Sequence, residues 1–248
     1  MHVFVTGAGR GVGRAIAGRF ARDGYAVALT GRTAPGLQDS LEAITVAVAG
    51  AAVRHFVCDV ASRDDVHRAV EAAERELGPI DVLVNNAGIS ESAPFASMDD
   101  ELWERTLAVN LTGTYHCMRA VVPGMFARQS GRIINIASSA AKVGYPYTSA
   151  YVASKHGVLG LTRAVAIEAA SRGVTVNAIC PGWIASDMTE RAISRIAEKT
   201  GRTADEARRA IEAMNPQRRL IRPDEVAEVA AFLASPDGAG TNGEAIDV

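Results

Sequence analysis

Tyr151 and Lys155 lie four residues apart and are the residues in this chain whose types and spacing most readily suggest chemistry. Apolar residues recur around them at helical intervals, and side chains four positions apart on a helix share one face. A tyrosine phenol normally keeps its proton up to a pH of about 10. A neighbouring ammonium group favours the phenolate and lowers that pKa, which makes the tyrosine a usable proton donor or acceptor.

The same spacing also fits an amphipathic helix with a surface tyrosine and lysine, and the pair alone does not separate the two interpretations. Ser138 precedes the pair and directly follows an apolar run, so a second hydroxyl group could reach the same place. The elements that position these three residues therefore decide the interpretation.

Short apolar runs alternate with helical patterns along the whole chain. The runs predicted as strands are Val3–Thr6, Ala26–Thr30, Val53–Cys58, Val82–Val84, Arg132–Ala137, Val174–Ile179 and Ala245–Val248. The helical stretches lie around 12–23, 35–49, 63–77, 99–128, 151–172 and 223–234. The alternation predicts an α/β fold, a single Rossmann-type domain over residues 1–248 with a doubly wound parallel sheet of seven strands and helices on both faces. Ligands of such sheets bind beyond the carboxyl ends of the strands.

The first predicted strand runs into a glycine-rich turn that opens a helix. Its glycines have the spacing G-x-x-x-G-x-G at Gly7, Gly11 and Gly13, with Val12 between the last two. Glycines at such a turn let a pyrophosphate approach the N–H groups of a helix N-terminus. We therefore expect a dinucleotide site here, and a plain glycine-rich turn is the alternative.

The end of the second strand indicates which nicotinamide cofactor is accepted. An NAD site usually has an acidic residue there, which binds the ribose 2′-hydroxyl group. This chain has Arg32 instead, with Arg10 in the glycine-rich turn and no acidic residue until Asp39. Arginines pair well with a 2′-phosphate. NADP(H) is therefore favoured, with NAD(H) as the alternative, and two solvated surface arginines are the competing structural interpretation.

Polar residues also follow the third and fourth strands. Asp59 could accept a hydrogen bond from an adenine amino group, or it could cap the next helix. Residues 85–88 suit a tight turn and could also form the floor of a cofactor site. Asn110 interrupts an amphipathic helix, which indicates a role such as holding a water or bending the helix, or else a solvent-facing position.

Two segments could enclose a substrate. The first is the loop 140–150, and the second is the segment 183–222, which departs from the strand–helix alternation and contains two helix-like pieces around 189–214. A long connection at the carboxyl edge of a sheet is typically a lid or a binding segment. We expect residues 183–222 to form the substrate lid.

Composition narrows the classes of protein. The net charge is −2, with both signs spread along the chain, which argues against nucleic-acid and membrane-surface binding. No apolar run reaches the ~18 residues of a membrane span, and the first strand begins too early for a signal peptide. The cysteines, Cys58, Cys117 and Cys180, lack metal-ligand spacing, so we expect buried thiols, no metal site and a cytoplasmic location.

Taken together and in this order, the motifs resemble those of the short-chain dehydrogenase/reductase family, and the chain is most similar to its 3-oxoacyl thioester (acyl-carrier-protein and polyketide) ketoreductases. The matching segments are Thr6–Gly13, Asp59, Asn85–Gly88, Asn110, Ser138, Tyr151 with Lys155, and Pro181–Gly182. The resemblance implies an NADP-dependent oxidoreductase that acts on a small-molecule or carrier-bound ketone and forms a homotetramer. Relatives usually continue beyond the last strand with a Gly-Gly tail that this chain lacks.

Two other interpretations stay open. The segment 189–214 is similar in length to that of hydroxybutyrate and hydroxyacyl-CoA dehydrogenases, which often use NAD. An NAD-dependent dehydrogenase of 3-hydroxyacyl compounds or other secondary alcohols is therefore the alternative enzyme. A cofactor-binding regulator without activity is less favoured, because the Ser138, Tyr151, Lys155 and Asn110 set is intact.

The resemblance also implies a role for each matching residue. Ser138 would hydrogen-bond the substrate carbonyl oxygen, Tyr151 would protonate it, and Lys155 would hold the nicotinamide ribose and lower the pKa of Tyr151. Asn110 would position a water in a proton relay behind Lys155. The implied cofactor contacts are Gly7, Arg10, Gly11, Val12, Gly13, Arg32, Asp59, Val60, Asn86, Ala87, Gly88, Tyr151, Lys155, Pro181, Gly182, Ile184 and Ser186. The expected substrate contacts are Ser138, Gly144, Tyr145, Tyr151, Trp183 and Met188.

Overall fold

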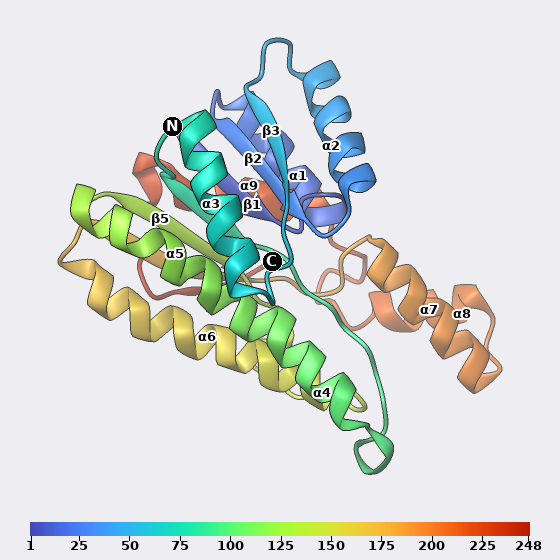
Figure 1. Cartoon of the computed structure of the whole chain (residues 1–248). Helices are drawn as coiled ribbons and strands as arrows, with labels where there is room; N and C mark the ends of the chain where they lie inside the picture. The colour runs from blue at the N-terminus through green and yellow to red at the C-terminus, as the bar shows by residue number, and fades with distance from the viewer.

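The computed structural model describes all residues from 1 to 248 and contains a seven-stranded sheet. The strands lie in the order β3-β2-β1-β4-β5-β6-β7, and every neighbouring pair is parallel (Figure 1). The chain reverses its direction of winding between β1 and β4, which makes the sheet doubly wound. The predicted Rossmann-type sheet of seven parallel strands is therefore confirmed.

The observed elements agree closely with the predicted ones. The strands are β1 (His2–Thr6), β2 (Ala26–Gly31), β3 (Val53–Val57), β4 (Val82–Asn85), β5 (Gly131–Ile136), β6 (Val174–Cys180) and β7 (Ala245–Asp247). The helices are α1 (Gly11–Arg22), α2 (Ala34–Ala47), α3 (Arg63–Leu77), α4 (Asp100–Leu107), α5 (Gly113–Arg128), α6 (Ser149–Ala170), α7 (Asp187–Thr200), α8 (Ala204–Glu212) and α9 (Pro223–Ala234). The predicted helix 99–128 is in fact α4 and α5, joined by a π-helical turn at Ala108–Thr112.

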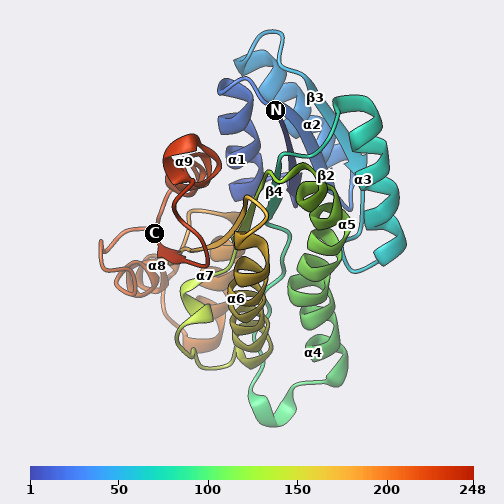
Figure 2. The ribbon, with the colours of Figure 1, turned by 90° about the vertical axis from the view of Figure 1, so that its left-hand side faces the viewer.

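The side chains of the strands alternate between two apolar cores, one on each face of the sheet. In β1, Val3 and Val5 belong to the core that includes α1, α2 and α9, whereas Phe4 belongs to the core that includes α3, α5 and α6. This alternation is the period of two that a strand imposes on its side chains. Figure 2 shows α1 and α9 on one side of the sheet and α3 and α5 on the other. Burial on both faces explains why the strands are continuous apolar runs.

A row of buried polar side chains lies in the core that includes α3, α5 and α6. Asn85 Nδ2 of β4 donates to Asn135 Oδ1 of β5 at 2.8 Å, and Asn135 Nδ2 donates to Thr162 Oγ1 of α6 at 2.9 Å. The Thr162 hydroxyl group donates in turn to the main-chain oxygen of Val158 at 2.8 Å. These bonds join two strands and a helix in one register, because a shift would leave buried polar groups without partners.

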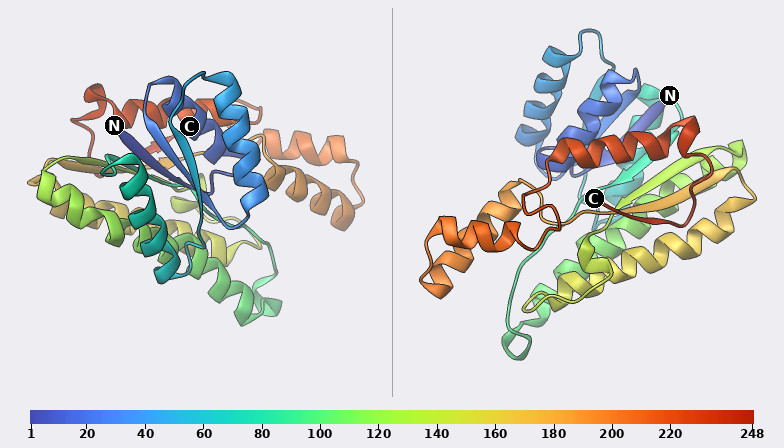
Figure 3. Two further views of the ribbon diagram at one scale, coloured as in Figure 1. Left: turned by 45° about the horizontal axis from the view of Figure 1, so that its top comes forward. Right: turned by 180° about the vertical axis from the view of Figure 1, so that it is seen from behind.

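α7 and α8 form a helical hairpin that projects beyond the carboxyl edge of the sheet (Figures 1 and 3). Ile193 of α7 packs with Ala207 and Ile211 of α8 in a small core of their own. Thr203 and Glu206 form a capping box that starts α8. The two helix-like pieces predicted around 189–214 are therefore confirmed. None of the helices in the structure has the length and apolar character needed to cross a membrane.

Asn135→Ala should lower the free energy of unfolding by about 2–4 kcal/mol, because it removes two buried hydrogen bonds and leaves their partners unsatisfied. Thr162→Val keeps the side-chain shape but removes the hydrogen bonds of its hydroxyl group with Asn135 and with the Val158 oxygen, so it should lower the free energy of unfolding by about 1–3 kcal/mol. Urea unfolding followed by circular dichroism measures both changes. Near-zero changes in both variants would show that the polar row does not hold β4, β5 and α6 together.

Candidate active site

The residues predicted to do chemistry meet at the carboxyl edge of the sheet. β5 ends at Ile136, and Ser138 follows it by two residues. α6 begins at Ser149, which puts Tyr151 in the first turn of the helix and Lys155 one turn later. Lys155 Nζ lies 5.7 Å from the centroid of the Tyr151 ring, and the Ser138 side chain lies near enough to the Tyr151 hydroxyl group to act on its pKa. The structure therefore brings the three predicted residues together.

Lys155 is held by the end of β5. Its side chain is buried, and Nζ donates a hydrogen bond to the main-chain oxygen of Ile136 at 2.8 Å. Burial disfavours the charged form and lowers the pKa of the Lys155 ammonium group to about 8. The charge on this lysine is therefore sensitive to pH in the mildly alkaline range.

The Tyr151 phenol differs from the prediction. Burial raises the pKa of Tyr151 above its ordinary value, and the nearby Ser138 side chain opposes this only in part. Desolvation of the buried phenol is the largest influence, so the net direction of the pKa shift is upward. The net pKa of Tyr151 is therefore raised where a lowered one was predicted, and the role of Lys155 toward the phenol stays a prediction. The phenol stays protonated at neutral pH, which is the form that a proton donor needs.

The two serines after β5 make different contacts. Ser138 Oγ accepts a hydrogen bond from the Ala140 N–H group at 3.1 Å and starts a short 3₁₀ helix. Ser139 Oγ lies 3.1 Å from the hydroxyl oxygen of Tyr145, which ties the loop 140–150 to the strand tip. Gly144, just before Tyr145, is exposed. The predicted substrate contacts of this loop thus lie beside the site, and the contacts themselves stay a prediction.

Asn110 is buried in the π-helical turn between α4 and α5. Its Oδ1 accepts from the Ile89 N–H group at 2.8 Å, while Nδ2 donates to the Ile89 oxygen at 2.9 Å and to Ser154 Oγ at 3.0 Å. A Cβ atom on Gly88 would lie 3.3 Å from Asn110 Oδ1 and 3.7 Å from Lys155 Nζ. A solvent-facing Asn110 is therefore wrong, and its water-binding role stays a prediction. Ser154 was missed because no local pattern distinguishes it.

The glycine-rich turn is built against the end of β4. Asn86 Nδ2 donates to the main-chain oxygens of Thr6 at 2.9 Å and Gly7 at 3.1 Å. Thr6 Oγ1 accepts from the N–H groups of Asn86 and Ala87 at 2.9 and 3.0 Å. A Cβ atom at Gly13 would lie 2.4 Å from the Gly7 oxygen and 2.5 Å from Asn86 Nδ2, so α1 can begin this close to β4 only with glycine there.

The N-terminus of α1 is open to a negatively charged ligand. Its N-cap residue, Arg10, makes no side-chain cap, its first turn holds no acidic residue, and a Cβ atom on Gly11 would meet nothing within 4 Å. Unpaired N–H groups at this helix end suit a pyrophosphate. Val12 packs against the core that includes α1, α2 and α9. Arg10 is exposed and forms a 3.4 Å ion pair with Asp187 of α7, and Arg32 is exposed just after β2. These residues fit a dinucleotide that carries an additional phosphate.

Asp59 follows β3, and its Oδ1 accepts from the Ala61 N–H group at 3.0 Å. Ser62 caps α3 by accepting from the Asp65 N–H group, so Asp59 does not cap this helix. That alternative is wrong, whereas the adenine contact of Asp59 stays a prediction. Val60 is buried next to it, behind the strand tip.

The chain after β6 is paired with the chain that returns from the hairpin. Ile184 and Ile221 form an isolated parallel bridge, and the Ile221 N–H group donates to the Trp183 oxygen at 2.9 Å. The Trp183 side chain packs against the small core of α7 and α8. Asn215 also hydrogen-bonds the main chain of Trp183. It was missed at the sequence level, where the Asn-Pro pair at 215–216 indicates only a turn.

The remaining predicted residues follow β6 and lie at the carboxyl edge of the sheet. The Pro181 oxygen accepts from the Ser139 N–H group at 2.9 Å, which joins the tips of β5 and β6. Ser186 caps α7 by accepting from the Thr189 N–H group, and Met188 is half-buried in the first turn of that helix. The carboxamide contact of Ser186 and the substrate contact of Met188 stay predictions.

Two surface hollows lie away from these residues. One, of about 310 Å³, lies at the amino edge of the sheet between Tyr25 and residues 48–52. The other, of about 500 Å³, lies beside the C-terminal half of α6, next to Ile167 and Gly243. Neither hollow is lined by a predicted site residue. The two hollows are therefore separate from the candidate active site.

Known proteins resemble this chain over nearly its full length. A family profile described as short chain dehydrogenase matches residues 1–197. A 3-oxoacyl-acyl-carrier-protein reductase of Staphylococcus epidermidis is 37% identical over 246 residues, which cover 98% of this chain and 95% of the relative. A D-beta-hydroxybutyrate dehydrogenase of Rhizobium meliloti is 37% identical over 243 residues, which cover 96% of this chain and 93% of the relative.

Solved structures are similar in the same way. A crystal structure of a variant of actinorhodin polyketide ketoreductase with NADPH has a TM-score of 0.96 and 38% identity, covering 100% of this chain and 95% of that chain. Levodione reductase has a TM-score of 0.95 and 33% identity, with the same coverage of 100% and 95%. The profile match, the relatives and the geometry agree, and the chain belongs to the short-chain dehydrogenase family.

Proposed function

We propose that this protein uses NADPH to reduce a ketone, and that the ketone is a 3-oxoacyl thioester or a similarly bulky compound, free or carrier-bound. The observation that carries the proposal is the joint position of Ser138, Tyr151 and Lys155 at the carboxyl edge of the sheet, beside the open N-terminus of α1. Relatives named for acyl-carrier-protein and polyketide ketone reduction, one of them solved with NADPH, support the same chemistry.

Tyr151, Ser138 and Lys155 each have a different role in the proposed carbonyl reduction. NADPH, when bound, supplies the hydride for the carbonyl carbon. As negative charge develops on the carbonyl oxygen, the Tyr151 hydroxyl group donates its proton to that oxygen, and the Ser138 hydroxyl group donates a hydrogen bond to it. The raised pKa of Tyr151 keeps the donor protonated before the reaction. The positive charge of Lys155 then stabilises the tyrosinate that remains.

Other residues would hold the cofactor and the substrate. The turn of Gly7, Gly11, Val12 and Gly13 would hold the pyrophosphate, and Asp59 and Val60 the adenine. Asn86, Ala87, Gly88 and Lys155 would lie along the nicotinamide ribose, and Pro181, Gly182, Ile184 and Ser186 along the carboxamide. Gly144, Tyr145, Trp183 and Met188 would line the substrate space. Asn110, beside Lys155, would hold a water for its reprotonation.

Arg10 and Arg32 support NADPH over NADH. Both are exposed near the open N-terminus of α1, and both can turn toward a 2′-phosphate. The alternative of NAD-dependent oxidation of a 3-hydroxyacyl compound or another secondary alcohol agrees with one relative, the D-beta-hydroxybutyrate dehydrogenase. It is less well supported, because the chain has arginine where an NAD site usually has an acidic residue.

The segment 183–222 is proposed as the lid of a single catalytic domain. Its hairpin has a core of its own, so it can move as a unit without losing its helices. The Arg10–Asp187 ion pair links the start of α7 to the glycine-rich turn at 3.4 Å. Both side chains are well exposed, so the ion pair is weak and can open readily.

Assembly as a homotetramer in the cytoplasm also remains a prediction. Tyr115 of α5 and Ile167 of α6 expose 49% and 80% of their surface, and a second copy could cover such exposed apolar side chains. The cysteines are free and buried, which agrees with a reducing compartment.

Tyr151→Phe should lower kcat for ketone reduction by about 10²–10⁴-fold, because it removes the proton donor and leaves the aromatic ring in place. The NADPH dissociation constant should stay close to that of the wild type. Steady-state assays and fluorescence titration measure the two quantities. Tyr147→Phe is the matched control, since it removes the hydroxyl group of an exposed tyrosine in the neighbouring loop. A Tyr151→Phe enzyme with near-normal kcat would contradict the assignment, whereas Lys155→Ala should impair both turnover and cofactor binding.

The rate of ketone reduction should fall as the pH rises through about 8, where Lys155 loses its proton. Tyr151 stays protonated over this range because its pKa is raised, so the decline reports on the lysine. A profile of kcat/KM from pH 6 to 10 tests this. A flat profile up to pH 10 would show that the Lys155 charge is not needed.

Arg32→Ala should raise KM for NADPH by about 10- to 100-fold and leave KM for NADH nearly unchanged, because only NADPH carries the 2′-phosphate. Arg22→Ala removes an exposed arginine at the opposite end of α1 and should change neither value. Assays of a panel of ketones, including a 3-oxoacyl thioester, with both reduced cofactors would test the substrate as well. Faster turnover with NADH than with NADPH in the wild type would favour the alternative dehydrogenase.

A further inference from the structure

Asn215 is a buried polar residue within an exposed stretch of chain. Residues 213–219 between α8 and α9 are otherwise exposed, yet only 2% of the Asn215 surface is accessible. Burying a carboxamide is unfavourable unless its oxygen and its N–H groups find partners. Its burial therefore points to a specific contact.

The contact joins the returning chain of the lid to the segment after β6. Asn215 Oδ1 accepts from the Trp183 N–H group at 2.9 Å, and Nδ2 donates to the main-chain oxygens of Trp183 at 2.9 Å and Arg219 at 2.7 Å. The carboxamide thus pairs with Trp183 as a strand residue would, next to the Ile184–Ile221 bridge. The Asn215 carboxamide therefore lengthens the pairing of the two chain segments from the Ile184–Ile221 bridge to Trp183.

Gly182 allows this close approach. A Cβ atom on Gly182 would lie only 2.3 Å from Asn215 Oδ1, so no other residue fits there without moving the carboxamide. The preceding residue, Pro181, accepts a hydrogen bond from the Ser139 N–H group at 2.9 Å. Asn215 is therefore connected, through Gly182 and Pro181, to the chain next to the catalytic Ser138.

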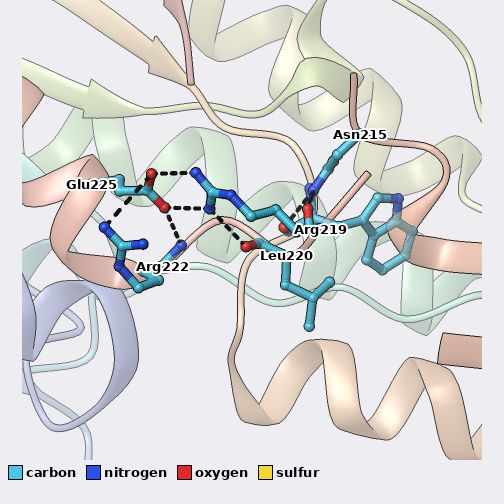
Figure 4. A network of polar contacts seen from close by, with 6 residues as sticks. Asn215, Arg219, Leu220, Arg222 and Glu225 are labelled. Carbon is cyan, nitrogen blue, oxygen red and sulfur yellow. Dashed lines mark hydrogen bonds and ion pairs between the residues drawn. The ribbon is translucent and has the colours of Figure 1, made fainter. Parts of the chain in front are cut away.

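The other side of Asn215 is anchored to the body of the protein. The Arg219 guanidinium donates to both carboxylate oxygens of Glu225 at 2.7 and 2.6 Å, and the Arg222 N–H group donates to the same carboxylate at 2.8 Å (Figure 4). The hydrogen bonds from the Arg219 side chain have the largest effect, and together with that from Arg222 they lower the pKa of Glu225 to about 2. Glu225 is therefore ionised at neutral pH. Glu225 belongs to α9, which packs on the sheet. Asn215 thus lies between this anchor and the projecting hairpin.

We propose that Asn215 is a positioning residue for the cofactor, which holds the main chain of Gly182 and Trp183 so that Ile184 and Ser186 face the nicotinamide carboxamide. It acts through this segment and touches neither the substrate nor the reacting atoms. Without its carboxamide the segment keeps the Ile184–Ile221 bridge but loses the hydrogen bonds on which its start depends. The assignment depends on the proposed use of a nicotinamide cofactor.

Asn215→Ala should raise the NADPH dissociation constant about tenfold, measured by fluorescence titration without any ketone present. KM for NADPH should rise by a similar factor, while kcat changes by less than about threefold, because Tyr151 and Ser138 stay in place. A variant that binds NADPH as tightly as the wild type would overturn the proposal.

Asn242→Ala is the matched control. The Asn242 carboxamide also joins distant main-chain segments, accepting from the Val176 N–H group at 2.9 Å and donating to the Ala166 oxygen at 2.9 Å, but at the amino end of β6. Both variants should lower the unfolding temperature, and only Asn215→Ala should weaken NADPH binding. If the two variants weaken NADPH binding equally, the effect of Asn215 is one of general stability and the proposal fails.

A double substitution tests the contact directly. Gly182→Ala should weaken NADPH binding because its methyl group displaces the Asn215 carboxamide. In an Asn215→Ala background that carboxamide is gone, so the second substitution should cost less than it does alone. Strictly additive effects on the NADPH dissociation constant would contradict the proposed contact.

These measurements separate this proposal from the proposed function. Tight NADPH binding that depends on Asn215, in a protein that reduces no ketone, would support the positioning role and contradict the reductase. Ketone reduction with unchanged cofactor binding in Asn215→Ala would do the reverse.

Discussion

One buried hydrogen bond, from the Lys155 ammonium group to the Ile136 oxygen, holds the side chains of the candidate active site in place. An ammonium group can be buried only where acceptors meet it, and the last residue of β5 provides one. This requirement fixes the rotation of α6 about its axis. Tyr151, one turn earlier on the same face, is then held beside the strand tip that carries Ser138. The end of a strand thus orients a helix, and the helix orients the Tyr151 hydroxyl group, the proposed proton donor.

The same burial sets the protonation of both groups in opposite directions. It raises the pKa of Tyr151 and lowers that of Lys155, because the charged form of each is the one that loses solvation. A neutral phenol beside a lysine that can change its charge is an arrangement suited to giving up a proton and regaining it. The pair is tuned more by its surroundings than by the attraction between its two members.

Asparagine carboxamides hold the loops around this pair. Asn86 joins the glycine-rich turn to β4, and Asn110 joins the loop after β4 to α6. Asn215 joins the chain that returns from the α7–α8 hairpin to the segment after β6. Loops at the carboxyl edge lie outside the ladder of the sheet, so their main-chain groups need other partners. A carboxamide offers both a donor and an acceptor, as a peptide group does, and can replace a missing strand neighbour.

The sequence by itself determined the architecture: apolar runs that alternate with helical patterns specify a sheet buried on both faces, and the glycine spacing and the Tyr151–Lys155 spacing are local properties of one turn and one helix. It did not determine the pKa of Tyr151, the surroundings of Asn110 or the contact of Asn215. The pKa of Tyr151 depends on desolvation, and the two asparagines depend on hydrogen bonds with distant partners. Asn110 bonds Ile89, 21 residues away in the sequence, and Asn215 bonds Trp183, 32 residues away. Only the packed chain decides which distant groups meet, so these properties were decided by the tertiary structure.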